Sequence, residues 1–253
     1  MLRKDTTETV VRNRVHVFDL IRGFSVISMV LFHYCYDLRF LAGVPLEFFV
    51  SPFIDIWRAS ISWTFFFVAG SMYSYSHNNL RRAGKYLLVA LLIFVVTSIA
   101  RVDIPINFGI IFCMGACTLA AFFLDKLRIL PKGMVGAVLL LLLFVSSLHI
   151  PQGYVSLFGL KAFLPQQLYD CGWLSWAGFP GPSFSSGDYY PLLPYAFLYL
   201  SANSLISYAK QAGFPDWFIK IKGAPLEFVG RHALPIYLLH QPVLLLLSIP
   251  FMG

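Results

Sequence analysis

Residues 19–37, DLIRGFSVISMVLFHYCYD, form an apolar segment of membrane-spanning length with charged or titratable side chains at both ends. At about 100° per residue, an α-helix places four of these side chains within about 60° of one another: Asp19, Arg22, His33 and Asp37. Ionisable side chains are costly inside a bilayer and usually serve a function there. His33 is the one that gains and loses a proton near neutral pH. The segment therefore predicts a membrane helix that carries a functional site.

The rest of the chain has the composition of a membrane protein. Its 253 residues are 58% hydrophobic and 12% charged, whereas soluble domains carry about 25% charged residues. Apolar stretches of about 20 residues recur along the chain. We therefore expect an all-α fold, a polytopic integral membrane helix bundle in which residues 1–253 form one domain. The predicted spans are roughly 16–36, 53–76, 84–101, 106–124, 133–150, 189–208 and 228–249, each placed by the length a bilayer requires.

The net charge of +7 follows from membrane topology and does not indicate nucleic-acid binding. With the N-terminus in the cytoplasm, seven spans leave four basic residues outside: Arg39, Arg58, Arg101 and Lys161. The other fifteen of the 19 face the cytoplasm, which satisfies the positive-inside rule. The N-terminus lacks the small-residue pattern of a cleavable signal. The cytoplasmic basic residues are Arg3, Lys4, Arg12, Arg14, Arg22, Arg81, Arg82, Lys85, Lys126, Arg128, Lys132, Lys210, Lys220, Lys222 and Arg231.

The long connection from 151 to 188 is expected on the outer side. It is apolar and aromatic but is broken by glycine and proline, so it is unsuited to a spanning helix. We interpret it as a re-entrant segment or lid over an outward-facing cavity; an aromatic belt anchor is the alternative. The four cysteines do not form a disulfide framework. Cys113 and Cys117 are expected to pack in the interior, and a pairing of Cys35 with Cys171 stays open.

The first span is predicted to hold two separate sites. Arg22 and His33 are 11 residues apart, which is about 16 Å along a helix. Asp19 and Arg22 have i,i+3 spacing, so they form either a structural ion pair or part of a binding site at the cytoplasmic end. Asp37 lies one turn beyond His33, where its carboxylate can fix the imidazole tautomer and raise its basicity.

The last span repeats this division between two ends. Arg231 and His232 lie near its cytoplasmic end, and His240 and Gln241 lie about 13 Å further along, at the depth of His33. A straight helix places Arg231 and His240 on opposite faces, although Pro235 permits a kink.

Other charged residues complete the candidate sites. Arg22, Arg81, Arg82 and Arg231 belong to a basic rim that can bind the phosphates of a nucleotide-bearing donor, or that simply follows from the positive-inside rule. At the outer end, Arg58, Asp188, Tyr189 and Gln241 are candidate substrate-binding residues; for Asp188, a favourable position at a helix N-terminus is the alternative. The metal and hydrolase motifs HExxH, GxSxG and CxxC are absent from the sequence, so we expect metal-free proton chemistry.

Five segments in order resemble bacterial membrane proteins related to heparan-α-glucosaminide N-acetyltransferase, over about 14–243. They are HVFDLIRGFSVISMVLFHYCYDL, FFFVAGS, NFGIIFCMG, DYYPLLPY and EFVGRHALPIYLLHQPV. The resemblance implies acyl transfer across the inner (plasma) membrane of a bacterium, from cytoplasmic acetyl-CoA or another acyl-CoA to a sugar amine or hydroxyl outside. Asp19, Arg22, Arg231 and His232 match its cytoplasmic motifs, whereas His33, Asp37, His240 and Gln241 match its outer ones. The lysosomal animal enzyme has its catalytic histidine in another segment and a different polar residue at the position of His33, so the catalytic assignment of His33 rests on the bacterial pattern and on the chemistry. Specificity for heparan is not implied.

We therefore predict a membrane acyltransferase with His33 as general base, assisted by Asp37 and His240; a route through an acyl-histidine intermediate is the alternative. The expected partners are the lipid bilayer, acyl-CoA and a glycan or amino-sugar acceptor, and the oligomeric state stays open, a homo-oligomer included. Two other classes compete with this prediction. A transporter or flippase would use the same polar stripe as a pathway, and a structural subunit would use it only for internal ion pairs.

Overall fold

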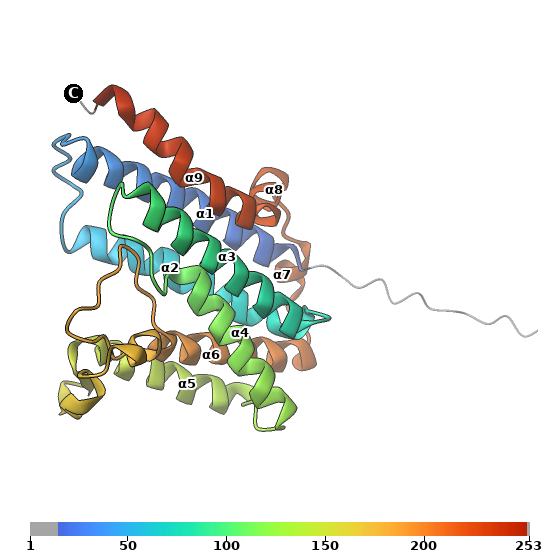
Figure 1. The fold of residues 1–253 in the computed structure, drawn as a ribbon. Helices are drawn as coiled ribbons and strands as arrows, with labels where there is room; N and C mark the ends of the chain where they lie inside the picture. The colour runs from blue at the N-terminus through green and yellow to red at the C-terminus, as the bar shows by residue number, and fades with distance from the viewer. Residues whose placement is uncertain (1–14, 252–253) are drawn as a thin grey trace, which may run out of the picture.

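The computed structural model describes residues 15–251, which form a helix bundle (Figure 1). A short π-helix, Asp37–Leu41, continues the first helix. The connection from 151 to 188, which we call the outer connection after its predicted side, contains the strands β1 (Tyr154–Leu157) and β2 (Leu160–Phe163). The α-helices are α1 (His16–Tyr36), α2 (Phe53–Ser71), α3 (Asn79–Ala100), α4 (Ile110–Lys126), α5 (Gly133–Ser147), α6 (Leu192–Ala212), α7 (Asp216–Lys220), α8 (Ala224–Arg231) and α9 (Ala233–Ser248).

Six of the predicted spans correspond to one helix each, but the last does not. The first span begins and ends at the predicted residues. The third begins earlier than predicted, at Asn79, because the Asn78 side chain caps the helix by accepting a hydrogen bond from the Arg81 backbone N–H at 2.8 Å. The predicted span 228–249 is divided at His232 into α8 and α9. Non-helical backbone at His232 causes the break, and Pro235 lies in the first turn of α9, where its missing N–H costs nothing.

Four helical segments among the described residues are long and apolar enough to cross a membrane: His16–Leu41, Asn79–Ala100, Gly133–Gln152 and Ala233–Phe251. Length and composition therefore support four of the seven predicted spans. The remaining predicted spans correspond to α2, α4 and α6, which supply much of the buried interior. α4, for example, has 17 residues, slightly fewer than the about 20 that a typical bilayer requires.

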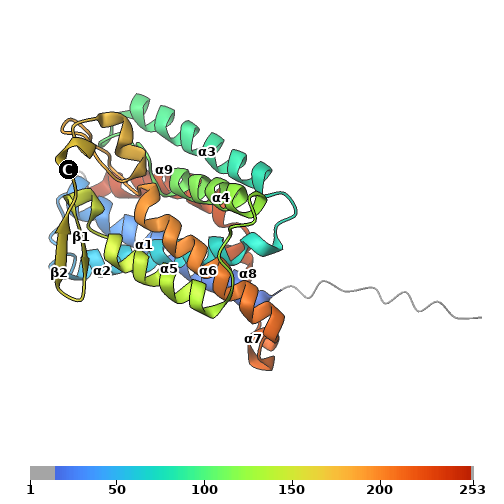
Figure 2. The same cartoon turned by 90° about the horizontal axis from the view of Figure 1, so that it is seen from below.

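The helices pack as a row with a second layer against it. α9, α1, α2, α6 and α5 contact one another in that order, and α4 packs on α2 and α6 with α3 beside it (Figures 1 and 2). The arginine end of the bundle carries the start of α1 with Arg22 and the start of α3 with Arg82, together with α7 and α8. The histidine end carries the end of α1 with His33, the starts of α2, α4 and α6, and the β-hairpin (Figure 1).

Two glycines allow α1 and α8 to cross in close contact. A Cβ added to Gly23 would lie 2.0 Å from the Leu226 carbonyl oxygen, and one added to Gly230 would lie 1.9 Å from the Asp19 carbonyl oxygen. His16 joins the same two helices through an Nδ1–Oε2 contact of 2.7 Å with Glu227. The motifs D-x-x-R-G and G-R-H are therefore packed against each other, and their glycines are required by this contact.

The outer connection is more regular than the sequence suggests. It forms an antiparallel hairpin in which Tyr154 pairs with Phe163, followed by 3₁₀ turns at Gln166–Leu168 and Gly172–Ala177. The fold is thus nearly, not entirely, α-helical. Cys35 and Cys171 are free thiols, and Cys113 and Cys117 are buried in the interior as predicted.

Candidate active site

Two histidines from opposite ends of the sequence meet at the contact between α1 and α9. The ring centroids of His33 and His240 are 4.9 Å apart, and the ring planes are inclined at 64° in an edge-to-face arrangement. The Nδ1 of His240 lies 2.6 Å from the Tyr237 carbonyl oxygen. A carbonyl oxygen only accepts hydrogen bonds, so Nδ1 carries the hydrogen and Nε2 keeps its lone pair. His240 is therefore held in the tautomer that can accept a proton at Nε2.

Asp37 contacts Gln241 instead of His33. The side-chain amide nitrogen of Gln241 donates to both carboxylate oxygens of Asp37, at 2.9 and 3.1 Å. Among residues 15–251, His33 makes no hydrogen bond to Asp37, so the predicted His33–Asp37 pair is wrong in its geometry. The reason is that Asp37 is fully buried and both of its carboxylate oxygens accept hydrogen bonds from Gln241 of α9.

Two hydrogen-bond acceptors at this contact are left without a donor. His240 Nε2 and Gln241 Oε1 are both buried and have no partner among the described residues. Buried polar atoms in native structures are nearly always paired, so each exception needs a reason. A ligand that brings donor hydrogens, such as an amine or a hydroxyl, would satisfy both atoms.

Arg22 and Arg82 line one pocket of about 70 Å³ between α1, α2, α3, α4 and α9. Arg22 bonds Asp19 at 3.0 Å, which confirms the predicted i,i+3 ion pair, and it also donates to the Gly230 carbonyl oxygen. Arg82 donates to the Ala69 carbonyl oxygen at 2.9 Å and lies over the ring of Tyr86. The two guanidinium groups come from helices far apart in sequence, and the arrangement suits an anionic group.

The other predicted donor-binding residues lie outside this pocket. Arg81, Arg231 and His232 are exposed at the same end of the bundle. Arg231 donates to the Glu227 carbonyl oxygen, and His232 contacts the Phe228 carbonyl oxygen at 2.8 Å. They are available to groups that approach from the surface.

Asp188 caps α4, although it precedes α6 in sequence. Its carboxylate accepts a hydrogen bond from the Ile110 backbone N–H at 3.2 Å, where the helix dipole favours a negative charge. Burial raises the pKa of Asp188 from 3.8 to about 6, opposed by the bond from Ile110 and by the charge of Arg58. Arg58 itself is exposed and pairs with Asp55 at 3.3 Å. Tyr189 donates to the Ser175 carbonyl oxygen at 2.6 Å, which ties it to the outer connection.

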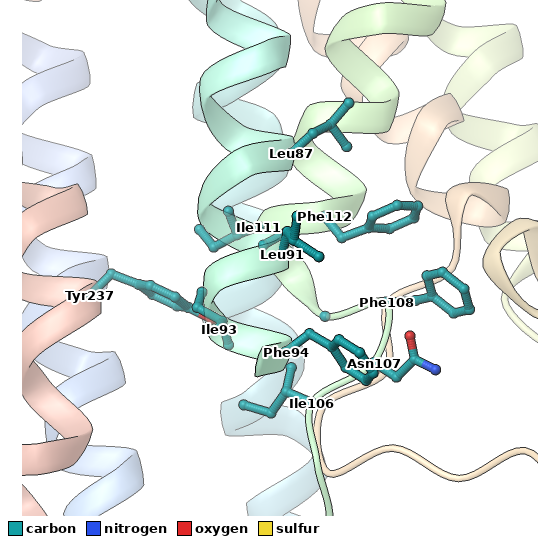
Figure 3. Close-up of a pocket in the computed structure, with 12 residues that line it drawn as sticks. Leu87, Leu91, Ile93, Phe94, Ile106, Asn107, Phe108, Ile111, Phe112 and Tyr237 are labelled. Atoms are coloured by element: carbon teal, nitrogen blue, oxygen red, sulfur yellow. The ribbon is translucent and has the colours of Figure 1, made fainter. Parts of the chain in front are cut away.

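A larger apolar pocket of about 240 Å³, which we call the apolar chamber, lies between α3, α4 and α9 (Figure 3). Ile111 and Tyr237 line both this chamber and the arginine pocket. Tyr237 was not predicted as a site residue, because a tyrosine in an apolar helix cannot be distinguished by sequence from a packing residue. Its position three residues before His240 is the signal that could have identified it. The chamber's lining residues are Leu87, Ala90, Leu91, Ile93, Phe94, Ile106, Asn107, Phe108, Gly109, Ile111, Phe112 and Tyr237.

Comparison with known proteins identifies the family of this site. No curated protein and no solved structure matches the chain. The family profile "Heparan-alpha-glucosaminide N-acetyltransferase, catalytic" matches residues 14–242, which include every residue of the histidine and arginine sites. The chain therefore belongs to the heparan-alpha-glucosaminide N-acetyltransferase catalytic-domain family, whose activity is of the acetyltransferase type.

Proposed function

We propose that this protein transfers an acyl group, acetyl by its family, from acyl-CoA to an amine or hydroxyl of a sugar acceptor. The observation that carries the proposal is the pair His33–His240, with His240 fixed in one tautomer and its Nε2 buried without a donor from residues 15–251. A neutral imidazole with a free lone pair is the group that general-base catalysis requires.

The reaction is a direct displacement at the thioester carbon. The acceptor nitrogen or oxygen attacks the acyl carbon, and its proton moves to Nε2 of His240. The carbon–sulfur bond breaks, and the CoA thiolate takes the proton from the imidazolium. This assigns the role of base to His240, with His33 as the adjacent ring that supports the imidazolium or relays the proton. The sequence favours the reverse order, with His33 as base.

The arginine pocket is the proposed donor site. At about 70 Å³ it holds about two water-sized groups, since one water occupies about 30 Å³. It can therefore take a single phosphate or part of the pantetheine arm, but not the nucleotide. The nucleotide would lie outside it, near the exposed Arg81, Arg231 and His232. The arginine end is then cytoplasmic, at the inner membrane of a bacterium, and the acceptor binds from the histidine end.

The test is transfer from radiolabelled acetyl-CoA to amino sugars by the full chain in lipid nanodiscs. We expect His240→Ala and His33→Ala to lose about 10²-fold or more in kcat, the usual contribution of a general base, and to bind acetyl-CoA as the wild type does. His149→Ala is the matched control, because that histidine stacks on Tyr154 in the outer connection. Unchanged turnover in both histidine variants would refute the assignment. Acetyl-CoA-independent uptake of a sugar by wild-type protein would favour the transporter.

A further inference from the structure

We infer that the acceptor is a lipid-borne molecule whose aliphatic chain lies in the apolar chamber. This inference rests on the proposed function and specifies its acceptor. The chamber is separate from the arginine pocket and the histidine pair, and the family's activity does not account for it: an acetyl group has two carbons and needs no space of about 240 Å³.

The lining of the chamber has the chemistry of a hydrocarbon site. α3 contributes Leu87, Leu91 and Phe94, and α4 with its preceding loop contributes Phe108 and Phe112 (Figure 3). Two side chains of the lining carry polar groups, the amide of Asn107 and the hydroxyl of Tyr237. Apolar walls with few polar groups favour an aliphatic ligand and fix its orientation at the polar positions.

The chamber is open towards the lipid. Leu91 and Phe94 line it, yet their exposed fractions are 58% and 40%. Of the four helical segments that are long and apolar enough to cross a membrane, α3 is the least buried: only 6% of its most apolar 18-residue stretch is buried inside the protein. Its outer surface therefore faces the bilayer. A ligand held in the membrane can enter beside this helix, whereas a water-soluble sugar has no need of such an opening.

Tyr237 connects the chamber to the reacting groups. Its ring lies in the wall shared with the arginine pocket, its carbonyl oxygen fixes His240, and the Tyr237 and His240 ring centroids are 5.5 Å apart. A chain bound in the chamber therefore places its head group beside His240, while the donor arrives from the arginine side.

The test is photolabelling of the full chain in nanodiscs with octyl glucosaminide that carries a diazirine in the chain. We expect label on Ile111 and Phe112, which lie behind α3; Ile111 is only 6% exposed. Ala90→Phe and Leu91→Trp should reduce this label at least fivefold. Leu92→Phe is the matched control, because Leu92 is 54% exposed and does not line the chamber. Unlabelled octyl glucosaminide should compete on the order of 10⁴-fold better than methyl glucosaminide, since its chain has seven more methylenes and each buried methylene strengthens binding about fourfold.

Three results would overturn the inference. One is label confined to the exposed side chains of α3, and another is label on Ile111 that both blocking variants leave unchanged. The third is competition by octanoyl-CoA with none by octyl glucosaminide, which would assign the chamber to the donor. Thermal unfolding of the same variants in nanodiscs, compared with that of the wild type, shows that they are folded. Labelling needs no donor, so a failure of the acyltransferase proposal would appear separately, as absent acetyl-CoA binding and absent transfer.

Discussion

Asp37 positions Gln241, and this pair gives the sharpest test at the scale of single residues. Asp37→Ala leaves the half-buried Gln241 amide nitrogen without its acceptor, at a cost of about 1.5–3 kcal/mol for a bond to a charged group. Asp37→Asn retains an acceptor oxygen, so its loss should be smaller. We expect the order wild type, Asn, Ala in thermal stability, with a fall in kcat and little change in the KM for acetyl-CoA. Equal stability of the Ala and wild-type proteins would contradict this role.

Asp188 is expected to make the folded protein less stable as pH rises, which is opposite to the effect of most carboxylates. Burial raises its pKa from 3.8 to about 6, so between these values the folded state binds more protons than the unfolded state. Stability contributed by this group is therefore present at low pH and is lost as pH rises towards and through about 6. Asp188→Asn should remove that part of the pH dependence. Thermal unfolding in nanodiscs from pH 4 to pH 7 measures it, and parallel curves for both proteins would exclude the effect.

The individual residues of the site could be predicted where one helix carries the information. His33, Asp19 and Arg22 share a face of α1, and the ion pair follows from spacing alone. Asp37–Gln241, His33–His240 and Arg22–Arg82 join different helices, so they depend on how those helices are rotated against each other. The spacing of residues within one segment gives no information about how two helices are rotated against each other. For this reason Asp37 is predicted to pair with His33, and the sequence does not distinguish Arg82, which lines the pocket, from Arg81, which does not.

At the scale of elements, the crossing of α1 and α8 depends on having no side chain at Gly23 and Gly230. Ala at either position would place a Cβ about 2 Å from a backbone oxygen of the other helix, so the helices must separate, with a cost of about 1–3 kcal/mol or more. We expect Gly23→Ala and Gly230→Ala to lower the melting temperature and weaken acetyl-CoA binding. Gly84→Ala in α3 is the control, since nothing lies within 4 Å of its Cβ. It should be neutral or slightly stabilising.

The positions of the helices could be predicted from the sequence because the thickness of the bilayer fixes the length of an apolar spanning segment. α1 shows this most clearly, since it begins and ends at the predicted residues. The break at His232 did not follow, since 228–249, FVGRHALPIYLLHQPVLLLLSI, has the length of one membrane span and was predicted as a single helix. The break depends on packing at the arginine end, where α8 crosses α1 at Gly230 and then α9 turns to run along α1. The hairpin at 154–163 was missed for a similar reason: its strands have four residues each, too few to show a period.

At the scale of the whole molecule, the charge distribution predicts that the arginine end faces the cytoplasm. Of the 19 lysines and arginines, fifteen fall on that side of the predicted topology, and basic loops are retained on the cytoplasmic side during insertion. The same orientation gives cytoplasmic acyl-CoA access to Arg22 and Arg82, so topology and donor binding stand or fall together. An inverted molecule would present its arginine pocket where no acyl-CoA is made.

Cysteine accessibility in intact cells tests this orientation. Lys161 lies on the exposed strand β2, and the Lys220 side chain is 75% exposed on α7, so cysteines at either position can be labelled without disturbing the interior. In a background with Cys35→Ser and Cys171→Ser, a membrane-impermeant maleimide should label Lys161→Cys in intact cells. Lys220→Cys should react only after the cells are permeabilised. The buried Cys113 and Cys117 serve as internal controls, since they should react only on unfolding. Labelling of Lys220→Cys in intact cells would invert the orientation, and with it the assignment of the arginine pocket to a cytoplasmic donor.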